Sequence, residues 1–200
     1  SLSLETRRKQ AALPLTVTGY SFAATEYQPS PDFRTVPLAQ PAAILLAKIT
    51  VGEPGTVNEP ISVLTDGKLA RNFGPVFRNG VVNGAYKLDL GSVRSIGEVR
   101  TFSFNQGTIR GHQRFVLYGS RAASDPGSNF EDQKTFTPIL EVDTQKAAMM
   151  DFVATSVRRS SGLPVGSYRW LIWAIAPVTK TGGGENTAFQ EFQVIPAAAE

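Results

Sequence analysis

A polar segment near the middle of this 200-residue chain carries four side chains that suit a binding loop. They are Asn105, Arg110, His112 and Arg114, and His112 is the only histidine of the chain. Planar amide, imidazole and guanidinium groups each make directional hydrogen bonds to neighbouring hydroxyl groups. The segment is therefore a candidate ligand-binding loop. The alternative is an ordinary polar hairpin loop in which Arg114 pairs with a nearby acid.

Aromatic side chains add candidates for stacking on a bound ring. Phe73 and Phe77 lie in a segment rich in Gly and Asn, and Phe130 lies in a polar one. In such segments an aromatic residue more often anchors the loop or packs into the core. Trp170 and Trp173 fall inside a strand-like run, where aromatic side chains are core residues in most cases.

The chain lacks the residue patterns of common hydrolases. It contains no cysteine, which excludes disulfides, thiolate metal sites and a cysteine nucleophile. It has no Gly-x-Ser-x-Gly elbow, and a single histidine cannot form a His-Glu-x-x-His zinc site. The glycine-rich residues 181–186 lack the Gly-Lys-Ser/Thr of a phosphate loop. The sequence therefore predicts that the protein is not an enzyme. A glycoside hydrolase is the alternative, since any two acids can meet in a fold.

Charge and hydropathy narrow the class of partner. The net charge is +3 and the basic residues are spread along the chain, whereas nucleic-acid binding needs a concentrated basic stripe. The longest apolar runs, 42–47 and 170–176, are much shorter than the roughly 20 residues of a membrane span. The chain begins with Ser1, which is compatible with a removed secretory signal. An extracellular domain without disulfides is more typical of a bacterium than of an animal.

Short runs of strand-forming residues, separated by turn residues, set the expected architecture. Tyr86, Leu88 and Leu90 alternate with Lys87 and Asp89, which is the period of a strand with one face on a core. No sustained helical pattern occurs, and the number and spacing of the runs favour an all-β sandwich. The main expected strands are residues 43–51, 86–90, 96–104, 115–118, 139–142, 149–154, 168–175 and 189–195.

The chain divides into three parts. Residues 1–40 are rich in proline, which favours extended edge segments, and Leu15 and Val17 suit one additional strand there. Residues 41–196 form the expected sandwich, and residues 197–200 read as a tail. Within the sandwich, the run 168–175 is apolar on both faces, which predicts a central strand covered on both sides.

Four pieces of the sequence resemble, in order and spacing, the discoidin branch (coagulation factor 5/8 type C) of the galactose-binding-like jelly rolls. Each piece matches a short family pattern, and together they cover about residues 40–196. The pieces are residues 63–68 with an Asp66-Gly67 turn, 86–91 with Asp89-Leu90-Gly91, 114–120, and the closing strands 168–172 and 188–194.

The resemblance implies a jelly-roll β-sandwich and a non-catalytic role. Members of this family bind carbohydrates or other extracellular surface ligands through loops at one end of the sandwich. The expected setting is extracellular, on the cell surface or in the periplasm, as one module among other domains of a larger secreted or surface protein. The alternative is a structural or protein–protein interaction module with no small-molecule ligand.

The resemblance also implies a structural calcium ion. In the family, the acid of the Asp-Gly turn and the glutamate of the last strand often bind calcium, and calcium prefers six to eight oxygen ligands. The matching positions are Asp66 and Glu191 for carboxylates and Lys68 and Ala188 for carbonyls. Thr65 or Asn72 would add a side-chain oxygen, although Arg71 stands where the family often has a small hydroxyl residue. The alternative is that Asp66 only caps its turn and that Glu191 is an exposed strand residue.

Overall fold

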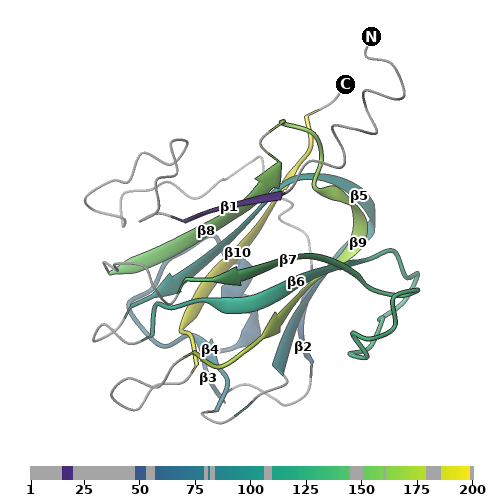
Figure 1. Ribbon diagram of the computed structural model, residues 1–200. Helices are drawn as coiled ribbons and strands as arrows, with labels where there is room; N and C mark the ends of the chain where they lie inside the picture. Colours follow the sequence, from purple (N-terminus) through teal and green to yellow (C-terminus); the bar gives the residue numbers. More distant parts are fainter. Residues whose placement is uncertain are drawn as a thin grey trace.

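Two layers of antiparallel strands form the part of the chain that the computed structural model describes (Figure 1). This part comprises residues 15–19, 48–52, 57–78, 81, 84–105, 110–144, 151–159, 161–178 and 186–198. The strands are β1 (Leu15–Gly19), β2 (Lys48–Gly52), β3 (Val57–Asn58), β4 (Pro75–Val76), β5 (Gly84–Phe104), β6 (Arg114–Ser120), β7 (Thr137–Asp143), β8 (Phe152–Arg159), β9 (Gly166–Ile175) and β10 (Phe189–Pro196).

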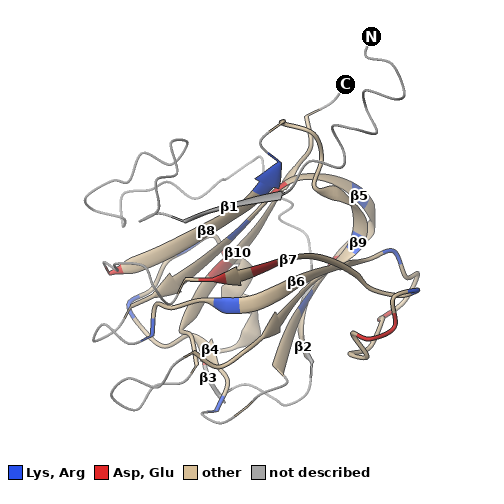
Figure 2. Ribbon diagram, in the orientation of Figure 1, with Lys and Arg blue, Asp and Glu red and all other residues tan. Residues whose placement is uncertain are grey.

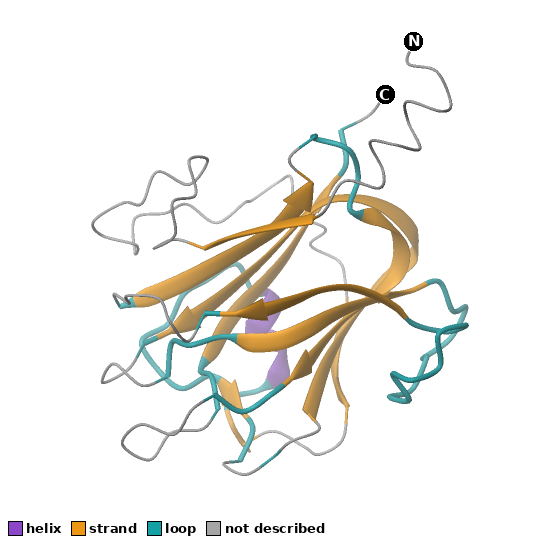
Figure 3. Cartoon of the chain, viewed as in Figure 1, coloured by secondary structure: helices purple, strands orange, loops and turns teal. Residues whose placement is uncertain are grey.

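Helical structure is minimal in the described part of the chain. One 3-10 helix, η2 (Ile61–Thr65), precedes the Asp66-Gly67 turn, and no α-helix occurs among the described residues (Figure 3). Nowhere in those ranges is there a helix of the length and apolar character needed to cross a membrane. The all-β prediction is confirmed.

Strand β5 belongs to both layers. Residues 84–89 pair with β2 and β9, whereas residues 98–103 pair with β8 and β10. Between them the register shifts, and Gly91 adopts a φ of 78°, in the left-handed region that favours glycine. The strands predicted at 86–90 and 96–104 are therefore two halves of one bent strand, and their prediction as separate strands was wrong. One layer is β2–β5–β9–β6–β7 and the other is β1–β8–β5–β10.

The largest hydrophobic cluster fills the space between the two layers. Alternate residues of β9 divide as predicted: Leu171, Trp173 and Ile175 join this cluster, while Trp170 and Ile172 belong to a second one. A central strand that is buried on both faces needs a cover on its outer side. The segment 121–136 provides that cover, since Phe130 and Phe136 pack into the second cluster. Phe130 also stacks on Tyr118, with ring centroids 4.9 Å apart, and so serves as a packing residue.

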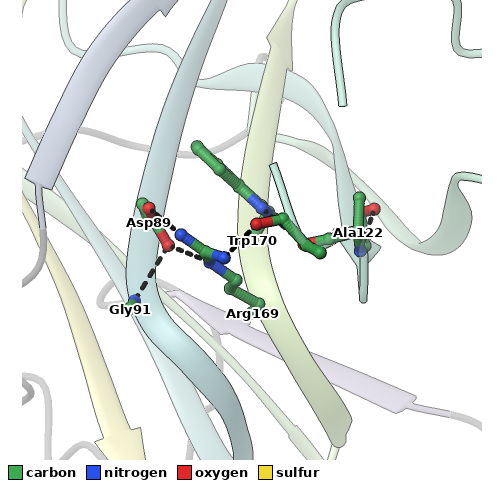
Figure 4. A network of polar contacts seen from close by, with 7 residues as sticks. Asp89, Gly91, Ala122, Arg169 and Trp170 are labelled. Carbon is green, nitrogen blue, oxygen red and sulfur yellow. Dashed lines mark hydrogen bonds and ion pairs between the residues drawn. The ribbon is translucent and has the colours of Figure 1, made fainter. Parts of the chain in front are cut away.

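Polar contacts hold the covering segment 121–136 against the sheet (Figure 4). The guanidinium of Arg169 donates to both carboxylate oxygens of Asp89 at 2.8 and 2.9 Å, and it also bonds the Ala123 carbonyl. The Trp170 Nε1–H donates to the Ala122 carbonyl at 3.0 Å. These bonds tie β5 and β9 to the cover.

Several predicted boundaries shift in the structure. Within the predicted strand 43–51 the described part begins at Lys48, and residues 43–47 lie outside the described residues. Strand β8 continues to Arg159, five residues beyond the end of the predicted strand 149–154. A strand at 15–19 is present as predicted, and it pairs with β8 as part of the sandwich. The remainder of residues 1–40 lies outside the described residues.

Candidate functional site

Strand ends from both layers meet at one end of the sandwich. The pairs Phe104↔Phe152 and Phe189↔Ser103 bring the ends of β5, β8 and β10 together. The pairs Phe115↔Ile175 and Arg114↔Asp143 add the ends of β6, β7 and β9. These strand ends, with the described residues that adjoin them, therefore lie at a single end of the sandwich, which we call the loop end. Antiparallel pairing is what places segments so distant in sequence beside one another.

An aromatic–guanidinium pair lies at the loop end. The Arg110 guanidinium carbon sits 5.2 Å from the centroid of the Phe73 ring, and Phe73 is 36% exposed. Arg110 Nη1 donates to the Asn186 carbonyl at 3.0 Å, which fixes the guanidinium over the ring. Burial lowers the pKa of Arg110 from its ordinary value, although the group stays charged at neutral pH. Of the candidate stacking residues, Phe77 is buried, so Phe73 is the aromatic available to a ligand.

The other predicted ligand residues surround Arg110. His112 is half-buried, and its Nδ1 lies 3.2 Å from the Thr144 carbonyl oxygen. Asn105 is buried, and its Oδ1 accepts a bond from the Gly111 N–H at 3.2 Å. Because a Cβ at Gly111 would lie 2.6 Å from the Asn105 Cβ, this amide is packed tightly into the loop itself. The structure thus brings Arg110 and His112 to the surface on either side of Gly111, with Asn105 beneath them.

Arg114 forms the pairing that the alternative interpretation of this loop predicted. Its Nε lies 3.9 Å from Asp143 Oδ2, and its Nη1 donates to the Pro177 carbonyl at 3.4 Å. A second ion pair, between Arg71 and Asp151, joins two further segments of the loop end. Both pairs are well exposed, so their charges are partly screened by water.

A buried network under the loop end escaped the sequence analysis. The Gln113 Nε2 lies within 3.0–3.3 Å of the Thr101 carbonyl, Ser103 Oγ and the Val153 carbonyl. Its Oε1 accepts a bond from Thr155 Oγ1 at 2.9 Å. The only signal in the sequence is that small hydroxyl residues occupy inward positions of β5 and β8, where apolar residues are expected. The network fixes the base from which Arg110 and His112 project.

The second predicted site joins the Asp66 turn to β10. The Gly67 N–H donates to Glu191 Oε1 at 3.1 Å, and Glu191 is only 3% exposed. Its Oε2 meets no donor at bonding geometry in the described part of the chain, although the Gln193 amide lies beside the carboxylate. Burial, and secondarily the charge of Asp66, raises the pKa of Glu191 to about 8. The alternative in which Glu191 is an exposed strand residue is wrong, because η2 and its turn cover this position.

The other predicted calcium ligands have partners of their own. Asp66 Oδ1 accepts the Lys68 N–H at 2.9 Å, so Asp66 does cap its turn. The Ala188 carbonyl accepts the Phe104 N–H at 2.9 Å. No group of three or more Asp, Glu, His or Cys side chains suited to a metal occurs among the described residues. Even so, two neighbouring carboxylates, one with an unsatisfied buried oxygen, fit a hard cation that would take its remaining ligands from carbonyls and water.

The same fold occurs in solved carbohydrate-binding modules. A family 32 module from NanJ of Clostridium perfringens, in complex with galactose, has a TM-score of 0.51 and 13% identity, covering 76% of this chain and 97% of that chain. Another family 32 module, from a family 31 glycoside hydrolase of Clostridium perfringens, has a TM-score of 0.50 and 11% identity. The match covers 78% of this chain and 97% of that chain. These likenesses show the predicted galactose-binding-like jelly-roll β-sandwich.

Comparison by sequence finds no relative. No protein-family model matches this chain, and no curated protein does.

Proposed function

We propose that this protein is a non-catalytic carbohydrate-binding module whose ligand site is the loop end. The observation that carries the proposal is the half-exposed Phe73 ring beside the fixed guanidinium of Arg110. An aromatic ring contacts the apolar face of a sugar, and fixed polar groups around it select the hydroxyl groups. The shared fold with family 32 modules, one of which was solved with galactose, supports this choice.

The side chains at the loop end offer complementary hydrogen bonds. When His112 Nδ1–H donates to the Thr144 carbonyl, the neutral ring presents Nε2 as an acceptor. Arg110 can only donate. A donor and an acceptor on either side of Gly111 suit two neighbouring sugar hydroxyls, one of which accepts while the other donates. The buried Gln113 network keeps both groups in place, which lowers the entropy cost of binding.

A glycan array followed by calorimetry with galactose and related monosaccharides tests the proposal. We expect Phe73→Ala to weaken binding about fivefold, because a stacked aromatic contact contributes roughly 1 kcal/mol. His112→Ala should also weaken binding. Val93→Ala is the matched control, since Val93 is 42% exposed but lies at the bend of β5, at the opposite end of the sandwich. Absence of binding to every glycan, or equal effects of Phe73→Ala and Val93→Ala, would favour the protein-interaction alternative.

The family assignment and the setting follow from the same proposal. The Asp66-Gly67 turn contacts the last strand through Gly67 and Glu191, as the discoidin resemblance implies. We therefore assign the chain to that branch, as an extracellular or surface module attached to other domains of a bacterial protein. Fractionation of the source cells with an antibody against the module tests the setting, and recovery in the cytoplasm alone would contradict it.

We further propose that the Asp66–Glu191 pair holds a structural calcium ion. The support is the buried carboxylate of Glu191, whose second oxygen meets no donor at bonding geometry among the described residues and which the charge of Asp66 repels. An ion that binds only the folded state raises its stability, by about 2.7 kcal/mol when calcium is at 100 times its Kd. The Tm should therefore rise with calcium and fall with a chelator. Asp66→Asn and Glu191→Gln should each abolish this response, and an unchanged Tm in wild type would exclude the site.

A further inference from the structure

Two exposed arginines, one in the bend of β5 and one directly after β6, have no role at the loop end. Arg94 lies in the bend and Arg121 directly follows β6, and both are exposed. Within the described residues neither has an ion pair. Arg94 is directly opposite Tyr168 on β9, so the two side chains leave the sheet on the same side.

Tyr168 is seated on two glycines that leave room for its ring. A Cβ at Gly119 would lie 2.4 Å from the ring, and a Cβ at Gly166 would lie 2.5 Å from it. Burial raises the pKa of Tyr168, while the charges of Arg159 and Arg121 act in the opposite direction. Both guanidiniums are therefore close enough to the hydroxyl to act on its charge. Close packing against Gly119 and Gly166 holds the ring in place, and its hydroxyl lies within electrostatic range of Arg121 and Arg159.

Arg159 is held in a fixed orientation beside Tyr168. Its Nε donates to the Pro164 carbonyl at 2.9 Å and its Nη2 to the Val165 carbonyl at 3.5 Å. The Val165 N–H in turn donates to the Ile96 carbonyl at 2.7 Å, which ties this loop to the bend of β5. A guanidinium fixed in this way loses little entropy when it binds a ligand.

The acids nearest to the bend along β5 are already paired. Asp89 bonds Arg169, and Glu98 bonds Arg100 at 2.8 and 3.0 Å. Blue positions accordingly fall at the bend of β5 and at the end of β8 (Figure 2). Along the described part of β5, the acids on either side of the bend are thus already paired with other arginines.

We propose that Arg94, Arg121, Arg159 and Tyr168 form an oxyanion site that binds a phosphate or sulfate group. Guanidinium groups bind tetrahedral oxyanions through charge-assisted hydrogen bonds, and the phenol adds one donor. The site lies at the end of the sandwich opposite the loop end, so it is separate from the sugar site. The group could reach the protein as a free ion or as an ester on a larger molecule.

Titration with inorganic phosphate and inorganic sulfate at constant ionic strength tests the site. NMR amide shifts of Gly119, Gly166 and Tyr168 should change and saturate. Arg94→Ala/Arg121→Ala should weaken binding at least about tenfold, because the variant loses two guanidiniums that make charge-assisted hydrogen bonds to the anion. Tyr168→Phe should weaken it less. The charge-matched control Arg78→Ala/Lys134→Ala, at two other exposed positions, should bind as wild type does.

The outcomes separate the alternatives. Shifts that do not saturate, or that persist unchanged in Arg94→Ala/Arg121→Ala, would overturn the proposal. Equal loss in the control variant would overturn it as well, because it would show general attraction to a cationic protein. Tighter binding of methyl phosphate than of inorganic phosphate would support the site and identify an ester as its ligand. None of these results depends on sugar binding at the loop end.

Discussion

Asp89 on β5 and Glu191 on β10 are carboxylates of two strands that pair with each other, and they are stabilised in different ways. Asp89 accepts two bonds from Arg169 and one from the Gly91 N–H at 2.9 Å. Glu191 accepts the Gly67 N–H and has no cation beside it among the described residues. Asp89 hydrogen bonding raises the pKa of Arg169, whereas burial raises the pKa of Glu191 itself to about 8.

The difference shows which carboxylate still needs a proton or a cation to balance its charge. A carboxylate that pairs with a guanidinium through two hydrogen bonds has its charge balanced. A ligand that bound there would have to break these hydrogen bonds. A buried carboxylate without a cation must bind a proton or a metal ion, or it destabilises the fold. Asp89 therefore acts as a structural clamp for the segment 121–136, whereas Glu191 is the position at which solution conditions act on stability.

The largest expected effect is a pH dependence of stability that originates in Glu191. Its folded pKa of about 8 lies above the ordinary value of 4.5, so the folded state holds the proton more tightly. The resulting stability is present in full below about pH 4.5 and is lost as pH rises through about 8. We expect the free energy of unfolding without calcium to fall by roughly 5 kcal/mol over this window, at about 1.4 kcal/mol for each pH unit between the two pKa values. Urea denaturation at several pH values measures it.

Glu191→Gln isolates this contribution. The amide keeps the shape of the side chain but does not ionise, so the variant should lose the part of the pH dependence that lies between about pH 5 and 8. Calcium should flatten the wild-type profile in the same window, because the ion neutralises the carboxylate. Identical profiles for wild type and Glu191→Gln would show that Glu191 is already neutralised within the protein.

An intermediate effect is expected from Asp89→Ala. The substitution removes the acceptor of three hydrogen bonds and leaves Arg169 without its clamp. The Tm should fall by several degrees, because Arg169 loses the contacts that hold it between the sheet and the covering segment. The near-UV circular dichroism of Trp170 should weaken as the covering segment loosens. If the stability lost in Asp89→Ala varied with pH over the same window as the contribution of Glu191, the two carboxylates would not differ in the way proposed.

The smallest effect is expected from Lys87→Met. Lys87 Nζ bonds Asp125 at 2.7 Å, but Asp125 is exposed, so the pair is partly screened. Methionine fills a similar volume, and the free energy of unfolding should change by no more than about 1 kcal/mol. The variant thus controls for disturbance of the segment 121–136. A change as large as that of Asp89→Ala would show that the Lys87–Asp125 contact is as important as the Asp89–Arg169 contact for holding this segment on the sheet.

Most of the fold, but less of the candidate site, could be predicted from the sequence. Alternation predicted the strands and the two apolar faces of β9, because packing requires this periodicity. The continuity of β5 was missed, since Gly91 looks the same in a turn between two strands as in a bend within one. The Asp66–Glu191 contact came from the family resemblance alone. The burial of Glu191 depends on the η2 turn that covers it, which no local pattern reveals.

The loop residues show the same limit at the level of single side chains. Asn105, Arg110 and Arg114 are equally polar in the sequence, yet Asn105 is bonded inside its loop and Arg114 contacts Asp143 and Pro177. Gln113 stands among them and is completely buried. Residue type predicts which bonds a side chain can make, but the partners come from strands far away in the chain.

The passage of β5 through both layers also determines how the protein should unfold. Because β2, β8, β9 and β10 all pair with this one strand, neither layer can separate while the other remains intact. Partial opening of one layer would pull β5 away from its partners in the other. The slowest-exchanging amides of both layers should therefore share a single opening free energy, equal to that of global unfolding. Under mechanical load the two layers should likewise fail in one event.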